Sequence, residues 1–414
     1  MDLQNDHSII NLQFMKITGF YQLLISSDAS KLFNINIYKI AFIVQILLVT
    51  FAAIMGIFSI YSCRNNVNQI IHYIIVIFAI YFAVFKYKFI IQNSKTIWDC
   101  MHMMSTNCLS YNDHTKEIFK IARTRSSSLI LISFSLWSSI VLYWSLSAIL
   151  IDNSYLKIKY ENIVYKYRSN AIGLVFPVTD TFYNKYFLVF YTIESVLLIC
   201  WGQMMWVFDI LMISICISIE YQLKTIADSY SLLGLKDNHL TYNNKTNKST
   251  KKIKAILDLE ILIQDQQNIF VKMKNMYQIL KPVVLIQLAA ESFQIILHAC
   301  MILKLYFDGS KSPTIFLKLL FPEITYLCHL FLTCYLFSIV NEQKESMNFA
   351  LYNSNWTDMD IKFKKLLLLT MRVNNAENLK MKISINRIVN MQMFADVMHI
   401  TYSIVSVMMK NYSK

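Results

Sequence analysis

The chain is short of helix-breaking residues and short of charge. Its 414 residues include 6 glycines and 4 prolines, and charged residues make up 16% of it, against roughly 25% in an ordinary soluble domain. Hydrophobic residues make up 56%, so intrinsic disorder is excluded, because disorder requires low hydrophobicity and high charge. A series of soluble modules is equally disfavoured. The composition indicates a chain that lies in lipid.

Motifs for catalysis and for metal binding are missing as well. The eight cysteines contain no CxxC pair, and the eight histidines show no metal-ligand spacing. There is no P-loop, GxSxG, HExxH or GxGxxG motif. We therefore expect no enzymatic activity, no cofactor and no metal site. The net charge of +13 does not require a nucleic-acid partner, since its distribution along the chain has another explanation.

Seven long apolar runs account for the hydrophobic content. A membrane-spanning helix needs about 20 mainly apolar residues, and the first three runs carry no charge at all. Residues 1–38 lack the features of a cleaved signal peptide, so the first run is expected to direct insertion. The runs are 40–63, 65–85, 126–151, 186–219, 282–303, 319–340 and 388–409.

The basic residues divide unevenly between the two sides of the membrane. The N-terminal segment and the loops after the second, fourth and sixth runs hold 28 of the 39 Lys and Arg, and the opposite side holds 11. The positive-inside rule then predicts a cytoplasmic N-terminus and, with seven spans, an extracellular C-terminus. This orientation argues against a G-protein-coupled receptor, whose N-terminus is outside.

A few acids lie inside the apolar runs, where charge is costly and is by default a sign of function. Glu194 is expected to reach interfacial water at the outer end of the fourth run. For Asp209 we favour a polar contact between helices near the inner surface, and for Glu291 either such a contact or a wet cavity. Asp396 lies in the seventh run and has no assigned role.

Aromatic and hydroxyl residues gather in the predicted outer halves of several runs. They fit either an interfacial aromatic belt with packing residues or a mostly apolar cavity with a few hydrogen-bonding groups, suited to a small volatile molecule. On one run, Trp137, Ile140 and Trp144 share a helical face. The candidate ligand contacts are His72, Tyr73, Val76, Trp137, Ile140, Tyr143, Trp144, Tyr191, Ser195, Leu198, Phe321 and Ile324.

The last third of the chain carries a family resemblance. An A-L-Y-N-S-N-W element spans residues 350–356, a basic and apolar segment follows from Phe363, and the seventh run contains the Thr401-Tyr-Ser stretch. This order resembles insect odorant receptors, and the early Phe14-Met-Lys-Ile-Thr-Gly-Phe resembles the N-terminal re-entrant segment of that family. Length, seven spans and an inside N-terminus agree with it over the whole chain.

The resemblance implies an all-α membrane protein that forms a ligand-gated non-selective cation channel. Family members are tetramers in which the seventh helix lines the pore, and the family's extracellular gate falls on Val405 and Met409. At Met408 the co-receptor and gustatory receptors carry Gln, so the chain resembles a tuning subunit that requires the odorant co-receptor. The resemblance further implies a small volatile odorant as ligand, the plasma membrane of a sensory neuron as location, and no need for a G protein.

The expected organisation has four parts, and two alternative functions remain open. A gustatory receptor would form a homomeric channel on the same fold. A transporter is weaker, because inverted repeats and helices broken by Gly or Pro near the midplane are absent. The first part is a cytoplasmic and re-entrant segment at 1–38. The second is six membrane helices at 39–340, with the odorant pocket in the outer half of helices two, three, four and six and a cytoplasmic loop at 221–281. The third is a cytoplasmic anchor at 341–387, and the fourth is the pore helix with a short extracellular tail at 388–414.

Overall fold

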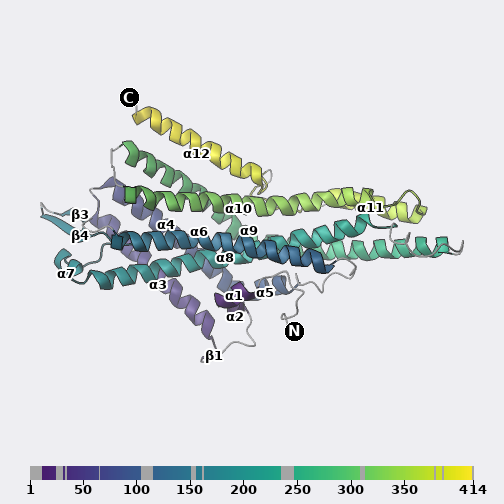
Figure 1. Cartoon of the computed structure of the whole chain (residues 1–414), viewed down its shortest axis with the longest axis horizontal. Helices are drawn as coiled ribbons and strands as arrows, with labels where there is room; N and C mark the ends of the chain where they lie inside the picture. The colour runs from purple at the N-terminus through teal and green to yellow at the C-terminus, as the bar shows by residue number, and fades with distance from the viewer. Residues whose placement is uncertain are drawn as a thin grey trace.

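Long helices running along one common axis make up most of the molecule (Figure 1). The computed structural model describes residues 12–24, 31–32, 35–64, 66–103, 115–150, 155–160, 163–234, 247–307, 313–376, 379–384 and 387–412. Two short antiparallel hairpins, β1–β2 and β3–β4, are the only sheets among these residues.

The elements follow one another in the order of the apolar runs. The strands are β1 (Lys31–Leu32), β2 (Ile35–Asn36), β3 (Tyr155–Tyr160) and β4 (Ile163–Arg168). The helices are α1 (Leu12–Ile17), α2 (Phe20–Leu24), α3 (Ile37–Ser62), α4 (Val67–Gln92), α5 (Ser94–Met103), α6 (Thr115–Leu150), α7 (Asp180–Lys185), α8 (Phe187–Ser231), α9 (Asn247–Phe307), α10 (Pro313–Tyr352), α11 (Ile361–Ala376) and α12 (Met391–Tyr412).

Six of the helices match the first six expected membrane spans. By length and composition, α3, α4, α6, α8, α9 and α10 could each cross a membrane. These segments are apolar throughout and contain few Gly or Pro residues, which suits a long helix. Because lipid offers no hydrogen-bond partners, the backbone N–H and C=O groups bond to one another within each helix. Where α4 begins, the Asn66 side chain accepts a hydrogen bond from the Gln69 N–H at 3.4 Å, which caps the helix.

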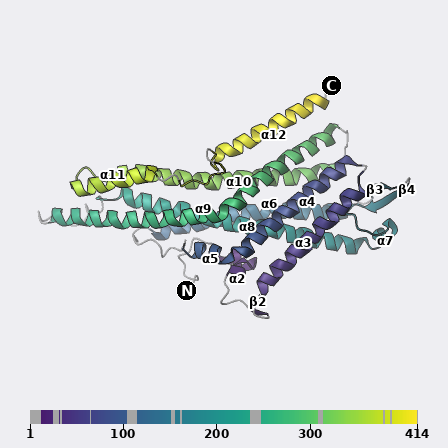
Figure 2. The ribbon, with the colours of Figure 1, turned by 180° about the vertical axis from the view of Figure 1, so that it is seen from behind.

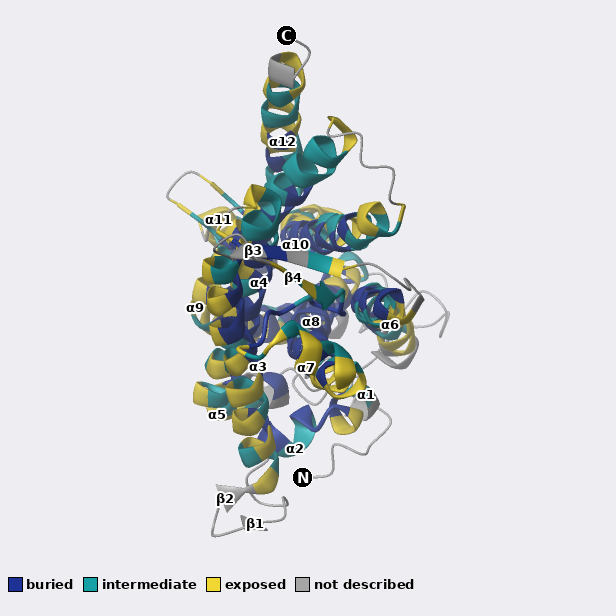
Figure 3. Ribbon diagram, turned by 90° about the vertical axis from the view of Figure 1, so that its left-hand side faces the viewer, coloured by how far each residue is buried: buried dark blue, intermediate teal, exposed yellow. Residues whose placement is uncertain are grey.

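Helix α8 forms the centre of the bundle. Its 45 residues correspond to about 67 Å of helix, about twice the hydrocarbon thickness of a membrane. Between Met204 and Leu223 nearly every side chain is buried, on all sides of the helix. A helix that is apolar around its whole circumference is expected in a core, and the buried residues gather around α8 in Figure 3.

The seventh expected span corresponds to α12, which differs from the others. It has 22 residues and carries Asp396, His399 and Lys410, so it does not reach the apolar content of the other six. It contacts α9 and α10 and diverges from the bundle toward its C-terminal end (Figure 1). Ile400 and Val407 on one side of α12, and Tyr402 and Met409 on the opposite side, are exposed in the single chain.

The two ends of the bundle are different. Hairpin β3–β4 and α7 form one end, which we call the hairpin end. Helix α11 and the first half of α9 extend together at the opposite end, which we call the α11 end (Figure 2). Lys252 Nζ of α9 lies 2.8 Å from Oδ1 of Asp360, the residue that precedes α11.

The segment 221–281 is mostly helix rather than the expected loop. Residues 221–231 continue α8, and residues 247–281 form the first half of α9. Residues 247–281, before the fifth apolar run, contain many Lys, Asp and Glu residues. Buried Leu259, Leu262 and Ile269 nevertheless recur there at helical spacing. Amphipathic periodicity therefore continues the helix after continuous hydrophobicity stops. The Asn- and Lys-rich stretch from residue 241 lies partly outside the described residues and is helical from Asn247.

Candidate ligand-binding site

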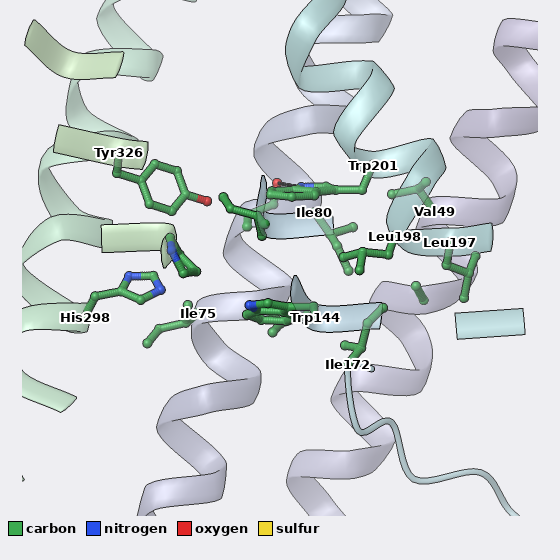
Figure 4. A pocket seen from close by; sticks show the side chains of 15 residues that line it. Val49, Ile75, Ile80, Trp144, Ile172, Leu197, Leu198, Trp201, His298 and Tyr326 are labelled. Atoms are coloured by element: carbon green, nitrogen blue, oxygen red, sulfur yellow. Dashed lines mark hydrogen bonds between the residues drawn. The ribbon is translucent and has the colours of Figure 1, made fainter. Parts of the chain in front are cut away.

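A cavity lies inside the bundle, toward the hairpin end. Its empty volume, counting the open space at its mouth, is about 540 Å³. Six helices and the segment before α7 surround it (Figure 4). Its lining residues are Val49 and Ala52 of α3, Ile75, Val76, Ala79 and Ile80 of α4, Ile140 and Trp144 of α6, Ile172 of the segment before α7, Leu197, Leu198 and Trp201 of α8, His298 of α9, and Pro322 and Tyr326 of α10.

The wall of the cavity is almost entirely apolar. Both indole N–H groups donate to backbone carbonyls: Trp144 Nε1 to Lys318 O at 3.2 Å and Trp201 Nε1 to Ala79 O at 3.3 Å. These bonds fix two large flat rings across the space, so the aromatic surface is rigid before any ligand arrives. Such a site favours molecules with a large apolar area and few polar atoms.

Residues 170–175, which we call the strap, cover the cavity on the side of the hairpin end. The Glu194 carboxylate accepts three consecutive backbone N–H groups of the strap, from Ile172 at 2.7 Å, Gly173 at 2.9 Å and Leu174 at 3.0 Å. Gly173 has φ of +80°, a left-handed conformation that only glycine adopts freely. Glu194 is completely buried and does not reach interfacial water as expected, because these amides take the place of water.

Side chains from two other helices, α4 and α10, bind the carbonyls of the strap. Tyr73 Oη donates to Gly173 O at 2.6 Å, and His72 Nε2 donates to Ile172 O at 3.2 Å. Lys318 Nζ donates to Asn170 O and Ala171 O, each at 3.2 Å. In addition, Val175 N donates to Ser59 Oγ at 2.8 Å. The strap is thus fixed on both its donor and its acceptor side, and its Ile172 lines the cavity.

A second, larger and more polar space lies on the other side of the strap. Its free volume is about 1,400 Å³ including its opening, and we call it the vestibule. Ile172 borders both spaces. Other lining residues include Asn66, Gln69, His72, Tyr73, Arg168, Lys304 and Lys318. The strap therefore separates an apolar interior from a polar, basic chamber.

A cluster of buried charges lies beside the cavity, deeper in the bundle. Asp209 Oδ2 accepts from Ser133 Oγ at 2.6 Å and from Trp137 Nε1 at 2.7 Å, and its Oδ1 lies 2.6 Å from His329 Nε2. His329 Nδ1 lies 2.5 Å from Glu291 Oε1. Lys86 is also completely buried, and its Nζ lies 4.8 Å from the ring centre of Phe208, the neighbour of Asp209 on α8. We refer to Lys86, Asp209, Glu291 and His329 as the charge cluster.

The charge cluster joins four helices and explains the buried acids of α8 and α9. Asp209 is a contact between helices, as favoured from the sequence, but it is 2% exposed and lies in the packed core rather than near the inner surface. The reason is the central position of α8, which surrounds Asp209 with polar partners from α6 and α10. Glu291 is likewise 1% exposed and binds His329.

The twelve expected ligand contacts fall into different places. Val76, Ile140, Trp144 and Leu198 line the cavity. His72 and Tyr73 border the vestibule and hold the strap. Trp137 points to Asp209, and Tyr143 donates to Thr314 O at 3.2 Å and packs against Phe321. Tyr191 stacks on Phe187, Ser195 is half-buried and Ile324 is 45% exposed. All twelve remain predictions as ligand contacts.

Several cavity residues were not among those predictions. Val49 and Ala52 come from the first run, which carries no aromatic or polar signal at these positions, and Ile172 lies outside any run. A signal did exist for Trp201, which follows Leu197 and Leu198 at helical spacing on α8, and for His298, a single polar residue in an apolar segment. Tyr326 lies one turn beyond Pro322 on the same face of α10.

The expected gate residues lie on the C-terminal half of α12. Val405 and Met408 are half-buried and Met409 is 48% exposed in the single chain. This part of α12 presents an apolar face that no other described segment of the chain covers completely. Their role in a pore stays a prediction.

The fold is similar to that of a solved insect olfactory receptor. The structure of the insect olfactory receptor OR5 from Machilis hrabei superposes with a TM-score of 0.73 at 16% identity, covering 96% of this chain and 97% of that one. The structure of the same receptor in complex with eugenol superposes with a TM-score of 0.73 at 14% sequence identity. The match covers 96% of this chain and 98% of that one. No curated protein sequence matches. Residues 66–402 match the family described as 7tm Odorant receptor, and the chain therefore belongs to the odorant receptor family.

Proposed function

We propose that the chain is the odorant-sensing subunit of a heteromeric, ligand-gated, non-selective cation channel. In this proposal the cavity between α3, α4, α6, α8, α9 and α10 binds one small, mostly apolar volatile. The odorant co-receptor completes the channel as a heterotetramer in the plasma membrane of a sensory neuron. The N-terminus is cytoplasmic and the hairpin end is extracellular, and gating requires no G protein.

The cavity and its enclosed, aromatic wall carry this proposal. Each Å² of apolar ligand surface removed from water contributes roughly 25 cal/mol, and Trp144, Trp201 and Tyr326 supply large flat areas for such contact. The related receptor OR5 has been solved in complex with eugenol, which supports a small organic molecule as the ligand class. Membership of the odorant receptor family supports the sensory role.

The pore is proposed to form where α12 helices of four subunits meet. The divergence of α12 from the bundle (Figure 1) and the exposure of its Val407 and Met409 support this arrangement, because they leave α12 accessible to neighbouring subunits. Val405, Met408 and Met409 would narrow the pore near its outer end and close it by excluding water. The α11 end, with α11 and the extended halves of α8, α9 and α10, would anchor neighbouring subunits in the cytoplasm.

A route from cavity to pore runs along α10. Tyr326 lines the cavity, and one turn further His329 binds Asp209 and Glu291. Further along the same helix, Phe331 packs edge-on against Phe394 with ring centroids 5.5 Å apart, and Ser338 Oγ accepts from Met391 N at 3.1 Å. A ligand that fits the cavity better when α10 is displaced would favour the open state, since only differential affinity shifts such an equilibrium.

Recording currents from cells that express the chain with and without the co-receptor tests the proposal. A panel of volatiles should evoke cation current only when both are present. Trp144→Ala should raise the half-maximal concentration of active volatiles by about tenfold or more, because it removes a wall of the cavity. Trp98→Ala, a truncation on α5 away from the cavity, is the matched control and should leave the response unchanged. Current from the chain alone would contradict the heteromeric assignment.

A further inference from the structure

Two polar groups of the cavity are available for hydrogen bonds to a ligand, and they face each other from adjacent helices. His298 of α9 and Tyr326 of α10 line the cavity, are 2% and 3% exposed, and have ring centroids 5.7 Å apart. In Figure 4 the Tyr326 hydroxyl and the His298 ring both point toward the interior of the cavity. One polar atom of a ligand can therefore reach both groups.

The hydrogen bond of His298 to its own helix fixes which nitrogen is an acceptor. Its Nδ1 lies 2.8 Å from Gln294 O, and because a carbonyl oxygen only accepts, Nδ1 carries the hydrogen. In a neutral imidazole the other nitrogen, Nε2, is then an acceptor. The ring is neutral since an imidazolium among apolar side chains would be costly. His298 thus offers the ligand an acceptor.

Tyr326 supplies the complementary donor. Its hydroxyl forms no hydrogen bond with any residue that the structure describes, although its ring is buried. The indole N–H groups of Trp144 and Trp201 are already bound to carbonyls, so they are not available. Among the described lining side chains, the cavity therefore presents one donor and one acceptor side by side, surrounded by apolar surface.

We infer, on the basis of the proposed function, that the preferred ligands are volatile alcohols and phenols. A ligand hydroxyl accepts from Tyr326 Oη and donates to His298 Nε2, so both groups and the ligand are satisfied at once. A carbonyl, ester or ether oxygen only accepts and leaves Nε2 unpaired, which costs affinity. Hydrocarbons leave both groups unpaired, and carboxylates or ammonium ions would bring a charge into an apolar space.

Three probes of nearly equal size test this assignment: octanol, its isomer heptyl methyl ether, and nonane. On cells that express the full chain with the co-receptor, octanol should act at a concentration about tenfold lower than the ether, corresponding to one net hydrogen bond. His298→Phe should raise the half-maximal concentration of octanol about tenfold and leave that of the ether unchanged. Tyr326→Phe should weaken both, because both accept from the hydroxyl. Tyr306→Phe, at an exposed tyrosine of α9, is the matched control and should change neither.

A binding measurement separates this inference from the channel function. Quenching of tryptophan fluorescence in the purified full chain reports ligands beside Trp144 and Trp201. His298→Gln keeps an acceptor and should retain more of the octanol preference than His298→Phe. Equal affinity for octanol and ether in the unmodified chain would overturn the inference while leaving the odorant function standing. A preserved octanol preference in binding, with no current under any condition, would overturn the channel function and support the inference.

Discussion

Trp137 donates its indole N–H to Asp209 at 2.7 Å and thereby connects the wall of the cavity with the charge cluster. The Trp137 ring packs edge-on against Trp201 and Tyr326, which line the cavity, with centroids 5.5 Å and 5.9 Å away. It also packs against His329 at 5.4 Å. A ligand that moves either aromatic wall is therefore in direct mechanical contact with the groups that hold α6, α8 and α10 together.

Asp209→Asn should destabilise the chain strongly. It removes one of two negative charges and leaves Lys86 and His329 with a single carboxylate, and breaking a buried ion pair costs about 3–5 kcal/mol. Adding Lys86→Met should recover part of this loss, since it restores the balance of charge. Thermal unfolding of the purified single and double variants measures both effects. A double variant no more stable than Asp209→Asn would contradict the pairing of Lys86 with this cluster.

Glu194→Gln should loosen the strap and shorten the time that a ligand stays bound. The amide keeps one acceptor oxygen for three N–H groups and loses the charge that strengthens the bonds. We expect current to decay several-fold faster after the odorant is washed away, with less change in the rate of activation. Tyr73→Phe removes a single bond to Gly173 and should give a smaller change in the same direction. Unchanged decay in both variants would mean that the strap does not cover the ligand.

Ala52→Leu should make the response depend on ligand size. Ala52 belongs to α3 and lines the cavity, so added methyl groups take up volume and exclude larger ligands before smaller ones. We expect the longest active members of a homologous series to lose potency by tenfold or more, while short members keep theirs. Ile286→Ala, at an exposed position of α9 outside the cavity wall, serves as the comparison. Equal loss for all chain lengths would indicate a general folding defect.

Val405→Glu tests the gate. A charged side chain in an apolar constriction stabilises water there and prevents closure by dewetting. We expect a standing cation current in the absence of odorant when the variant is expressed with the co-receptor. Normal closure and normal conduction in this variant would exclude Val405 from the gate, leaving Met408 and Met409 to be tested in the same way.

The sequence predicts the helices well because a membrane span has a strong and local signature. The charge-free run at 40–63 corresponds to α3 within three residues at each end. Continuous hydrophobicity does not predict the helices within 221–281, because the extensions of α8 and α9 there are amphipathic and depend on packing against α10 and α11. Asp396, the only acid of the seventh run, lies on an exposed face of α12, where sequence alone does not distinguish lipid from a partner subunit.

The site is less predictable since it depends on which faces of different helices meet. Trp144 and Leu198 could be found because aromatic and apolar residues repeat on one face of their helices. Ala52 could not, because a small residue gives no signal of the space beside it. Glu194 was expected to reach water, and only the fold brings the strap amides, 20 to 22 residues away in sequence, to its carboxylate.

A structure of the heteromeric channel with a bound active volatile tests the central claim most directly. The account predicts ligand density inside the cavity, in contact with Trp144, Trp201 and Tyr326 and covered by Ile172 of the strap. Density confined to the vestibule, or between the helices and lipid, with the cavity filled by side chains, would contradict it.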